Sequence, residues 1–317
     1  MMRFVVTQYD GRRFELPQPL RWRLDYACGV PCDSFSVTLP WKEGEEEVYR
    51  KAVELAVWHR EEQVFAGVVD EAEWGRSRQG GRATLTGRSL AARLLDNEAL
   101  AADYAAATLE DVLRDHVTPY GIQCRVDGNI PACQNFSISS GSSEWQVVYD
   151  FVRYHGGLPP RFDRQGRLVV APFGDGTVKM LDDSVPVLSL TGRERRYGVL
   201  SEILVRDKQR QVTDRVVNGA FQAQGGQARR VLTLNRSLGE RARRYNAQFQ
   251  LDKSAARQRR VEMEVPTLFF AWPGDLIRIQ RTNCVENGLW RVLEAVVEQN
   301  ENGGTTRLEL GKPDVVI

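Results

Sequence analysis

The 317-residue sequence has no apolar stretch near the roughly 18 residues that a membrane-spanning helix needs. Its first residues, 1–7, lack the apolar segment of a secretory signal peptide. Net charge is also nearly absent, at +1, which excludes a strong overall field for attracting nucleic acid or a charged membrane. We therefore expect a protein that is made and folds in a cytoplasm and does not bind a membrane.

Cysteine, histidine and lysine are scarce. The five cysteines, an odd number, argue against a disulfide framework and are expected to be buried reduced thiols. Neither Cys28/Cys32 nor Cys124/Cys133 has the two-residue spacing of a zinc knuckle, and the three histidines fall in no metal-binding motif. We expect no cofactor and no metal. Of the 43 basic residues only six are lysine, which leaves 37 arginines, the residue suited to bidentate ion pairs.

What the sequence does contain is a small β-unit that occurs twice. In residues 54–87 and again in 275–311, an apolar run is followed by a polar turn, a second apolar run, a Gly-Gly turn and an alternating strand ending on glycine. Val68 matches Val292 at an offset of 224 and Gly80 matches Gly303 at 223, which predicts a last turn one residue shorter in the second copy. Literal identity is low, so two unrelated meanders are the alternative; we favour duplication.

Three regions differ in pattern. Residues 1–97 show short alternating strands. Residues 98–185 contain helices that open with capping boxes at Thr108 and Ser143, and Ser89 is a candidate cap just before them. Residues 186–317 return to strands, with an arginine-rich helical insertion at about 237–261. The predicted fold class is α+β, mainly β: two related antiparallel β-barrel domains, an α+β domain between them and a helical insertion in the second barrel.

Four stretches carry a family resemblance. They are residues 84–96, residues 108–113 with 119–122, residues 144–158 with the hairpin at 163–168, and residues 273–279 with 288–292 and the closing strand. In this order they resemble the baseplate hub proteins of contractile phage tails: the late control protein D group, the hubs of Mu-like phages and of defective Bacillus prophages, and the hub part of type VI spike proteins. Spike-fused members continue into a spike, so the resemblance implies a separate spike protein here.

The resemblance implies a non-enzymatic structural protein with tail-tube-like barrels. Three chains with two barrels each would form a pseudo-sixfold ring that joins a hexameric tail tube to a trimeric spike; closed rings need interfaces that repeat at equal angles. The implied partners are two further copies of the chain, the tail tube protein, the spike protein, other baseplate proteins and a tape-measure protein, with no sequence-specific nucleic acid. The implied location is the baseplate of a virion or tailocin, assembled in the bacterial host cytoplasm.

Residues 202–260 have a net charge of +9, with 14 basic and five acidic residues. Three interpretations are open: binding to nucleic acid phosphates, a solvated helix face, or an intersubunit ion-pair surface. For the last, the candidate residues are Glu43, Glu45, Glu46, Glu47, Arg241, Arg243, Arg244, Arg257, Arg259 and Arg260.

The alternative function is a peptidoglycan-degrading tail-tip enzyme. Glycoside hydrolysis needs two carboxyl groups, one with a raised pKa, and Glu144 beside Trp145 is the candidate acid. However, a helix N-terminus stabilises the ionised carboxylate, which favours a packing role for Glu144. Cys124, Cys133 and His155 lie in one region, but nothing in the sequence brings them together for nucleophilic catalysis.

Overall fold

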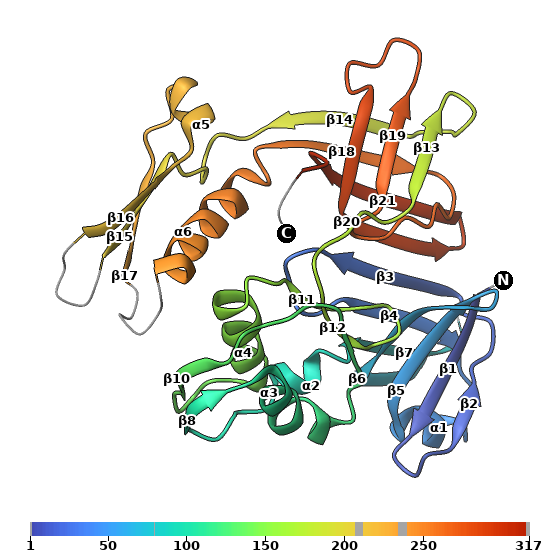
Figure 1. Cartoon of the computed structure of the whole chain (residues 1–317). Helices are drawn as coiled ribbons and strands as arrows, with labels where there is room; N and C mark the ends of the chain where they lie inside the picture. Colours follow the sequence, from blue (N-terminus) through green and yellow to red (C-terminus); the bar gives the residue numbers. More distant parts are fainter. Residues whose placement is uncertain (1, 79, 207–211, 234–239, 315–317) are drawn as a thin grey trace.

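The computed structural model describes residues 2–78, 80–206, 212–233 and 240–314 (Figure 1). Strands account for 47% of the chain and helices for 17%, so the protein is mainly β, as the sequence predicts. No helix in these ranges is both long and apolar enough to cross a membrane.

The N-terminal region is a sheet of alternating strands. Its elements are β1 (Met2–Gln8), β2 (Arg13–Glu15), β3 (Arg21–Ala27), β4 (Ser34–Pro40), α1 (Glu46–Arg50), β5 (Ala52–His59), β6 (Glu62–Ser77) and β7 (Gly80–Ser89). In β3 every second side chain, Trp22, Leu24 and Tyr26, is buried, which is the pattern expected of a strand with one face on a core.

The middle region contains most of the helices. Its elements are α2 (Ala92–Leu95), β8 (Ala102–Ala107), α3 (Leu109–His116), the 3₁₀ turn η1 (Thr118–Tyr120), β9 (Cys124–Val126), β10 (Cys133–Ile138), α4 (Glu144–Tyr149), the π-helical η2 (Asp150–His155), β11 (Pro160–Phe162) and β12 (Leu168–Val170).

The predicted helix starts are partly right. Thr108 and Asp111 form a complete capping box at α3. Ser143 accepts the Gln146 backbone N–H, but the Gln146 side chain donates to Asp150 instead of returning to the cap. Ser89 caps no helix: it is the last residue of β7, and the N-cap residue of α2 is Ala91.

The C-terminal region holds the second half of the large sheet and an insertion. Its elements are β13 (Val178–Asp182), β14 (Ser189–Glu194), β15 (Glu202–Arg206), β16 (Val212–Val217), α5 (Gly219–Ala223), β17 (Arg229–Thr233), α6 (Glu240–Ala255), β18 (Arg259–Val265), β19 (Leu276–Gln280), β20 (Gly288–Asn300) and β21 (Gly303–Gly311). The insertion between β14 and β18 is a separate three-stranded sheet, β16-β15-β17, against which α6 packs through Ala247 and Leu251 (Figure 1).

Strand pairing joins the two halves of the molecule. The main path runs β14-β18-β21-β20-β3-β4-β7-β6-β5-β1-β2, with β19 and β13 attached beside β20. Thirteen of the described strands therefore form one sheet, and their pairing does not show the two closed barrels that the sequence predicts. The reason is that β20 pairs with β3 of the other half, so a single sheet continues across the chain.

One apolar core spans both halves of this sheet. Its aromatic centre includes Tyr26 and Phe65, whose ring centroids lie 6.0 Å apart, and Trp272 from the C-terminal half lies 5.0 Å from Tyr26. A second core, around Phe151, fills the middle region.

Candidate assembly interface

The duplicated unit is visible in the strand register. Val68 pairs with Arg88 in β6–β7, and Arg291 pairs with Gly311 in β20–β21, which gives an offset of 223 on both strands. A register irregularity falls at the same place in both hairpins, directly after Val69 and Val292.

The predicted shorter last turn is wrong. The last pair before the turn is Ser77 with Gly80 in the first copy and Asn300 with Gly303 in the second. Both residues of the pair are displaced by 223 positions, so the two turns have the same length. The one-residue difference lies earlier in the unit. Leu55 of β5 pairs with Gly67 of β6, and Ile277 of β19 pairs with Trp290 of β20. The offset between the copies is therefore 222 on the first strand and 223 on the second, so the loop that joins these strands is one residue longer in the second copy.

The correspondence extends beyond the three strands found in the sequence. The orders β3-β4-β7-β6-β5 and β14-β18-β21-β20-β19 match, with every pairing antiparallel. Because Gly87 corresponds to Leu310, their partners Phe35 and Val261 correspond as well. One strand further, Trp22 corresponds to Leu190. The insertion thus occupies the place of the short loop between β3 and β4. The next neighbours differ, since β1 is antiparallel to β5 whereas β13 is parallel to β19.

The junction between the two units is a strand pairing. From Arg291 to Asn300, one side of β20 pairs with β21. On the other side, β20 pairs first with β19, up to Arg291, and then with β3, from Glu294 to Gln299. An ion pair between Arg23 and Glu298, 3.4 Å apart, supports the β3–β20 junction.

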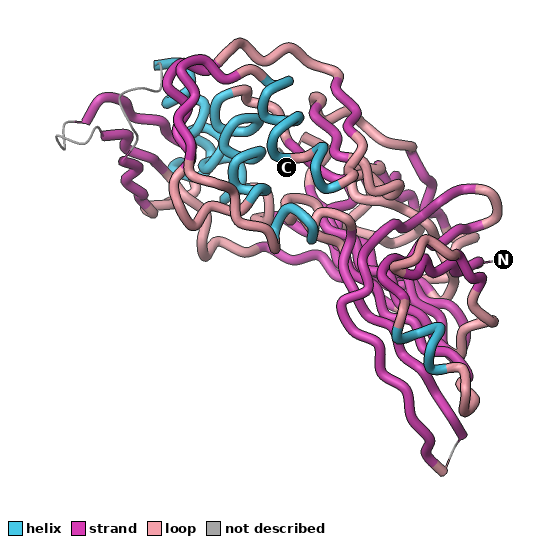
Figure 2. The backbone as a smooth tube through the Cα atoms, turned by 90° about the horizontal axis from the view of Figure 1, so that it is seen from below, coloured by secondary structure: helices cyan, strands magenta, loops and turns pink. Residues whose placement is uncertain are grey.

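The corresponding edges at the two ends pair with no further described strand, although α1 contacts β6. β6 pairs with β5 only up to Val68, so the β6 stretch from Glu71 to Arg76 has β7 on one side and no described strand on the other. Figure 2 shows these ends of β6 and β7 extending away from the rest of the molecule. In the same way β14 has β18 on one side and lies at the end of the sheet. Open strand edges present unpaired backbone N–H and C=O groups and readily add a further strand.

The candidate ion-pair residues lie on three separate elements. Glu43 and Glu45 precede α1, and Glu46 and Glu47 begin it; Glu47 forms ion pairs with Arg50 and Lys51. Arg243 and Arg244 lie on α6, where Arg244 is 3.6 Å from Asp214; the side chain of Arg241 lies outside the described residues. Around β18, Arg257 pairs with Glu294, Arg259 with Glu286 and Arg260 with Glu309, all within the chain. The intersubunit role of this set stays a prediction.

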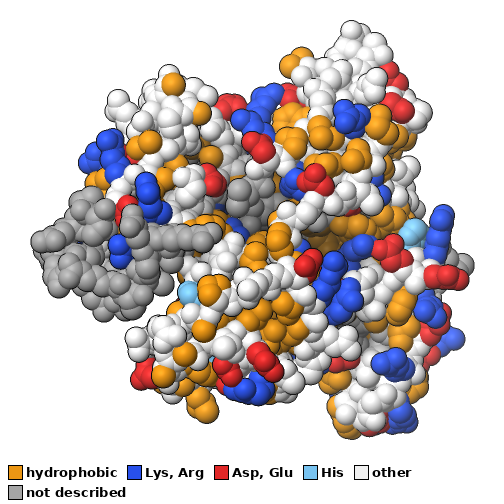
Figure 3. Space-filling model, viewed as in Figure 1, with side chains coloured by type: hydrophobic (Ala, Val, Ile, Leu, Met, Phe, Trp, Pro, Cys, Tyr) orange, Lys and Arg blue, Asp and Glu red, His pale blue; other side chains and the backbone are white. Residues whose placement is uncertain are grey.

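Exposed apolar side chains mark another surface. Val178 and Met180 lie two residues apart, on one face of β13, and are 54% and 46% exposed. Figure 3 shows hydrophobic side chains gathered over the strands at the upper right of the view, where β13 lies.

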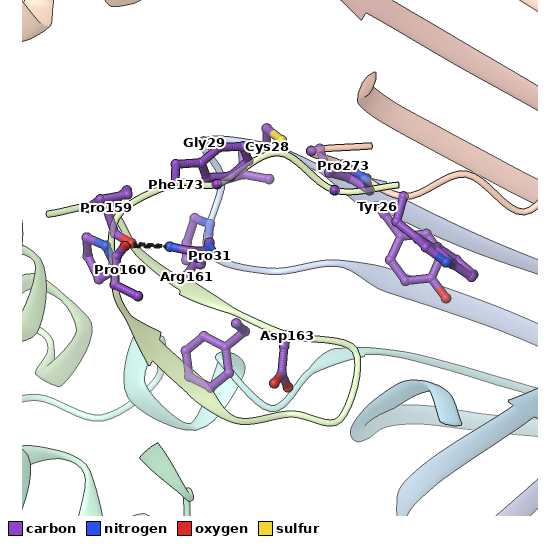
Figure 4. A pocket seen from close by; sticks show the side chains of 18 of the residues that line it. Tyr26, Cys28, Gly29, Pro31, Pro159, Pro160, Arg161, Asp163, Phe173 and Pro273 are labelled. Carbon is purple, nitrogen blue, oxygen red and sulfur yellow. Dashed lines mark hydrogen bonds between the residues drawn. The ribbon is translucent and has the colours of Figure 1, made fainter. Parts of the chain in front are cut away.

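A cavity of about 540 Å³ lies where the three regions meet (Figure 4). Prolines and aromatic rings line much of it, including Pro31, Pro160 and Phe173. Arg161 crosses it and donates to the Pro159 and Ala171 carbonyls at 3.1 and 2.9 Å. Burial lowers the pKa of this guanidinium. These contacts tie together the two ends of the β11–β12 hairpin.

Among the carboxyl groups that line the cavity, Asp33 has the pKa that is shifted furthest from its ordinary value. It accepts the Ala27 N–H at 3.2 Å, and burial raises its pKa to about 7. The folded protein therefore binds this proton more tightly than the unfolded chain. The resulting stabilisation is complete below the unfolded pKa, near 4, and is lost as the pH rises through about 7.

We expect Asp33→Asn to remove this pH dependence, since an amide keeps the acceptor but does not titrate. Between about pH 5 and about pH 8, wild type should lose about 2 kcal/mol of unfolding free energy more than the variant, a value reduced for the partial exposure of Asp33. Urea denaturation of both proteins at the two pH values measures the difference. Parallel pH profiles would contradict the assignment.

Glu144 is held in a buried hydrogen-bond network. Its carboxylate accepts from His116 Nδ1 at 2.6 Å and from the Tyr120 hydroxyl at 2.8 Å. On the far side of the imidazole, Nε2 lies 3.2 Å from the Tyr104 hydroxyl. Glu144 and His116 are each 6% exposed. With both carboxylate oxygens hydrogen-bonded and its side chain almost fully buried, Glu144 ties α4 to α3 and η1, which is the packing role favoured above.

The cysteines are free thiols, but they are less buried than expected. Cys124 is exposed and the other four are half-buried. Burial raises the pKa of Cys28 to about 12, which keeps this thiol protonated and unreactive. Among the described residues, no three Cys, His, Asp or Glu side chains are grouped closely enough to hold a metal ion.

Comparison with known proteins places the fold. No family model and no curated protein sequence matches the chain. Solved structures do match. A tail protein from Neisseria meningitidis is 18% identical, with a TM-score of 0.79 over 99% of this chain and 97% of that one. The 43 kDa tail protein of prophage MuSo2 from Shewanella oneidensis is 14% identical, with a TM-score of 0.76 over 99% and 98%.

A third similar structure is the Escherichia coli c3393 protein. It is described as a component of the type VI secretion system with structural similarity to the T4 tail proteins gp27 and gp5. It is 13% identical, with a TM-score of 0.57 over 92% of this chain and 73% of that one. The chain therefore has the fold of these tail proteins along its whole length, and the resemblance to baseplate hub proteins is confirmed at the level of fold.

Proposed function

We propose that the chain is the structural hub of a contractile-tail baseplate. In this role three copies form a ring that joins a hexameric tail tube to a trimeric spike, with other baseplate proteins around it. The observation that carries the proposal is the internal repeat: two units of matching strand order lie side by side, joined by the β3–β20 pairing. If the same pairing links one chain to the next, three chains supply six similar units around one axis.

Two further observations support a ring. The outer edge of β14 and the part of β6 beyond its pairing with β5 have no further described strand, so each could accept a strand of another copy in a ring. The exposed apolar face of β13, with Val178 and Met180, is suited to contact with a neighbouring protein. The similar solved structures are tail and type VI secretion proteins, which makes this assembly the natural context for the fold.

Light scattering coupled to size exclusion tests the proposal directly. We expect a particle of three times the chain mass of 35.9 kDa at micromolar concentration, and averaged electron micrographs should show six similar lobes around a channel. A monodisperse monomer, or a closed dimer or tetramer, would contradict it.

A cell-wall zymogram separates this role from the alternative enzyme. We expect no clearing of peptidoglycan by the purified protein. A cleared band that Glu144→Gln abolishes, in a variant that still folds, would favour the enzyme.

A further inference from the structure

We propose that β14 of one copy pairs, antiparallel, with the open Glu71–Arg76 edge of β6 in a second copy of this chain, with Arg193 opposite Glu73. The partner is thus another copy of the same protein, bound by strand addition. The strand pairing is inferred from the internal repeat alone. Only the closure of the ring at three copies rests on the proposed function.

The register comes from the junction that exists inside the chain. There, Tyr26 lies opposite Ala295, Leu24 opposite Val297, and Asp25 opposite Val296. The repeat relates β20 to β6 at an offset of 223 and β3 to β14 at 168. Substituting the corresponding residues gives the pairs Glu71–Arg195, Ala72–Glu194, Glu73–Arg193, Trp74–Gly192, Gly75–Thr191 and Arg76–Leu190.

The charges on the two edges are complementary in this register. Directly opposite residues in an antiparallel pair project to the same face, so Glu71 and Glu73 meet Arg195 and Arg193 on one face. All four side chains are exposed in the single chain. Glu71 and Glu73 have no ion-pair partner among the described residues, whereas Arg193 is 3.1 Å from Glu262 and remains 54% exposed. A shift by one residue would place Glu73 opposite Glu194 or Gly192 and lose this match.

The other face of the β6 edge carries apolar groups that the single chain leaves partly uncovered. Ala72 and Trp74 are half-buried and pack against the large core. The residues that correspond to them at the intrachain junction, Ala295 and Val297, are fully buried. In the proposed register Glu194 lies opposite Ala72 and Gly192 opposite Trp74, so the added strand would cover this face with its backbone, whereas the intrachain junction uses the large side chains of Tyr26 and Leu24.

Charge exchange tests the pairing. Glu73→Arg and Arg193→Glu should each weaken self-association by at least about tenfold, because like charges then face each other at every junction. The double variant should recover association to within about threefold of wild type, since each junction again holds one acid and one base. Glu110→Arg, an exposed exchange on α3, is the matched control and should leave association unchanged. Sedimentation equilibrium measures all four; single variants that associate like wild type would overturn the junction.

Disulfide trapping tests the register itself. Glu73→Cys combined with Arg193→Cys should cross-link on mild oxidation, and the ladder should end at three chains. Glu73→Cys with Thr191→Cys, displaced by two residues, should cross-link far less, and each single variant controls for the five native cysteines.

The outcomes separate the junction from the ring. A cross-linked ladder that ends at another number would keep the junction and overturn the trimeric hub. Wild-type trimers without the cross-link would overturn the junction and keep the hub. A chain that stays monomeric and does not cross-link at any concentration would overturn both.

Discussion

Replacing Glu144 with alanine is expected to lower the free energy of unfolding by about 2–4 kcal/mol, because two donors of a largely buried network lose their acceptor. The carboxylate accepts hydrogen bonds from His116 at 2.6 Å and from Tyr120 at 2.8 Å. Glu144 and His116 are each 6% exposed, so little water can replace the partner that the imidazole loses, whereas Tyr120 is half-buried. The variant leaves both donors unsatisfied and opens a gap between α3 and α4. Urea denaturation followed by circular dichroism measures the loss.

Two control variants separate the loss of the hydrogen bonds to His116 and Tyr120 from the loss of a negative charge at a helix N-terminus. Glu144→Gln keeps the shape and one acceptor, so it should cost only about 1–2 kcal/mol. Glu110→Ala removes an exposed carboxylate from the first turn of α3 and should change stability by less than about 0.5 kcal/mol. If alanine and glutamine at position 144 were equally damaging, the hydrogen bonds to His116 and Tyr120 would not be the cause.

Local signals in the sequence predicted local structure well. The Thr108 box works because its partner is three residues away and both groups are exposed at a helix start. The prediction that Ser89 caps a helix was wrong because the pairing of β7 with β4 continues to the neighbouring Arg88. The Ser89 hydroxyl accepts the Asp33 N–H instead. The His116–Glu144 pair was missed since its members are 28 residues apart and belong to separate helices.

The repeat was found in the sequence only where both copies keep the same apolar spacing and a Gly-Gly turn. The β4/β18 and β3/β14 matches escaped notice because the insertion separates β14 from β18, whereas only a short loop separates β3 from β4. Pairing β3 with β20 links residues that are far apart in the sequence, 275 positions for Arg23 and Glu298, and leaves no local trace. For the same reason the open edges with Glu71, Glu73, Arg193 and Arg195 were not among the predicted site residues; extending the repeat by register would have indicated them.

Phe65→Ala should destabilise the protein by about 3–5 kcal/mol, the usual cost of emptying a core aromatic site. Phe65 is 1% exposed and lies between Tyr26 and Phe35, with ring centroids 6.0 and 5.4 Å away. Tyr26 in turn contacts Trp272 at 5.0 Å, so the cavity would open in a core that both halves of the sheet share. Phe65→Leu, which retains most of the volume, should cost less than about 1.5 kcal/mol.

The variant also shows whether the two repeated units unfold as one. Because β3 pairs with β20 and one core runs beneath both, we expect a single calorimetric transition that shifts as a whole. Amide exchange should then accelerate in β18–β21 as much as in β3–β7, although Phe65 belongs to the first unit. Faster exchange confined to β3–β7 would mean that the units are stable separately and that the β20–β3 pairing is a weak contact. A weak pairing inside the chain would in turn be a poor template for a pairing between chains, so this measurement bears on assembly as well as on folding.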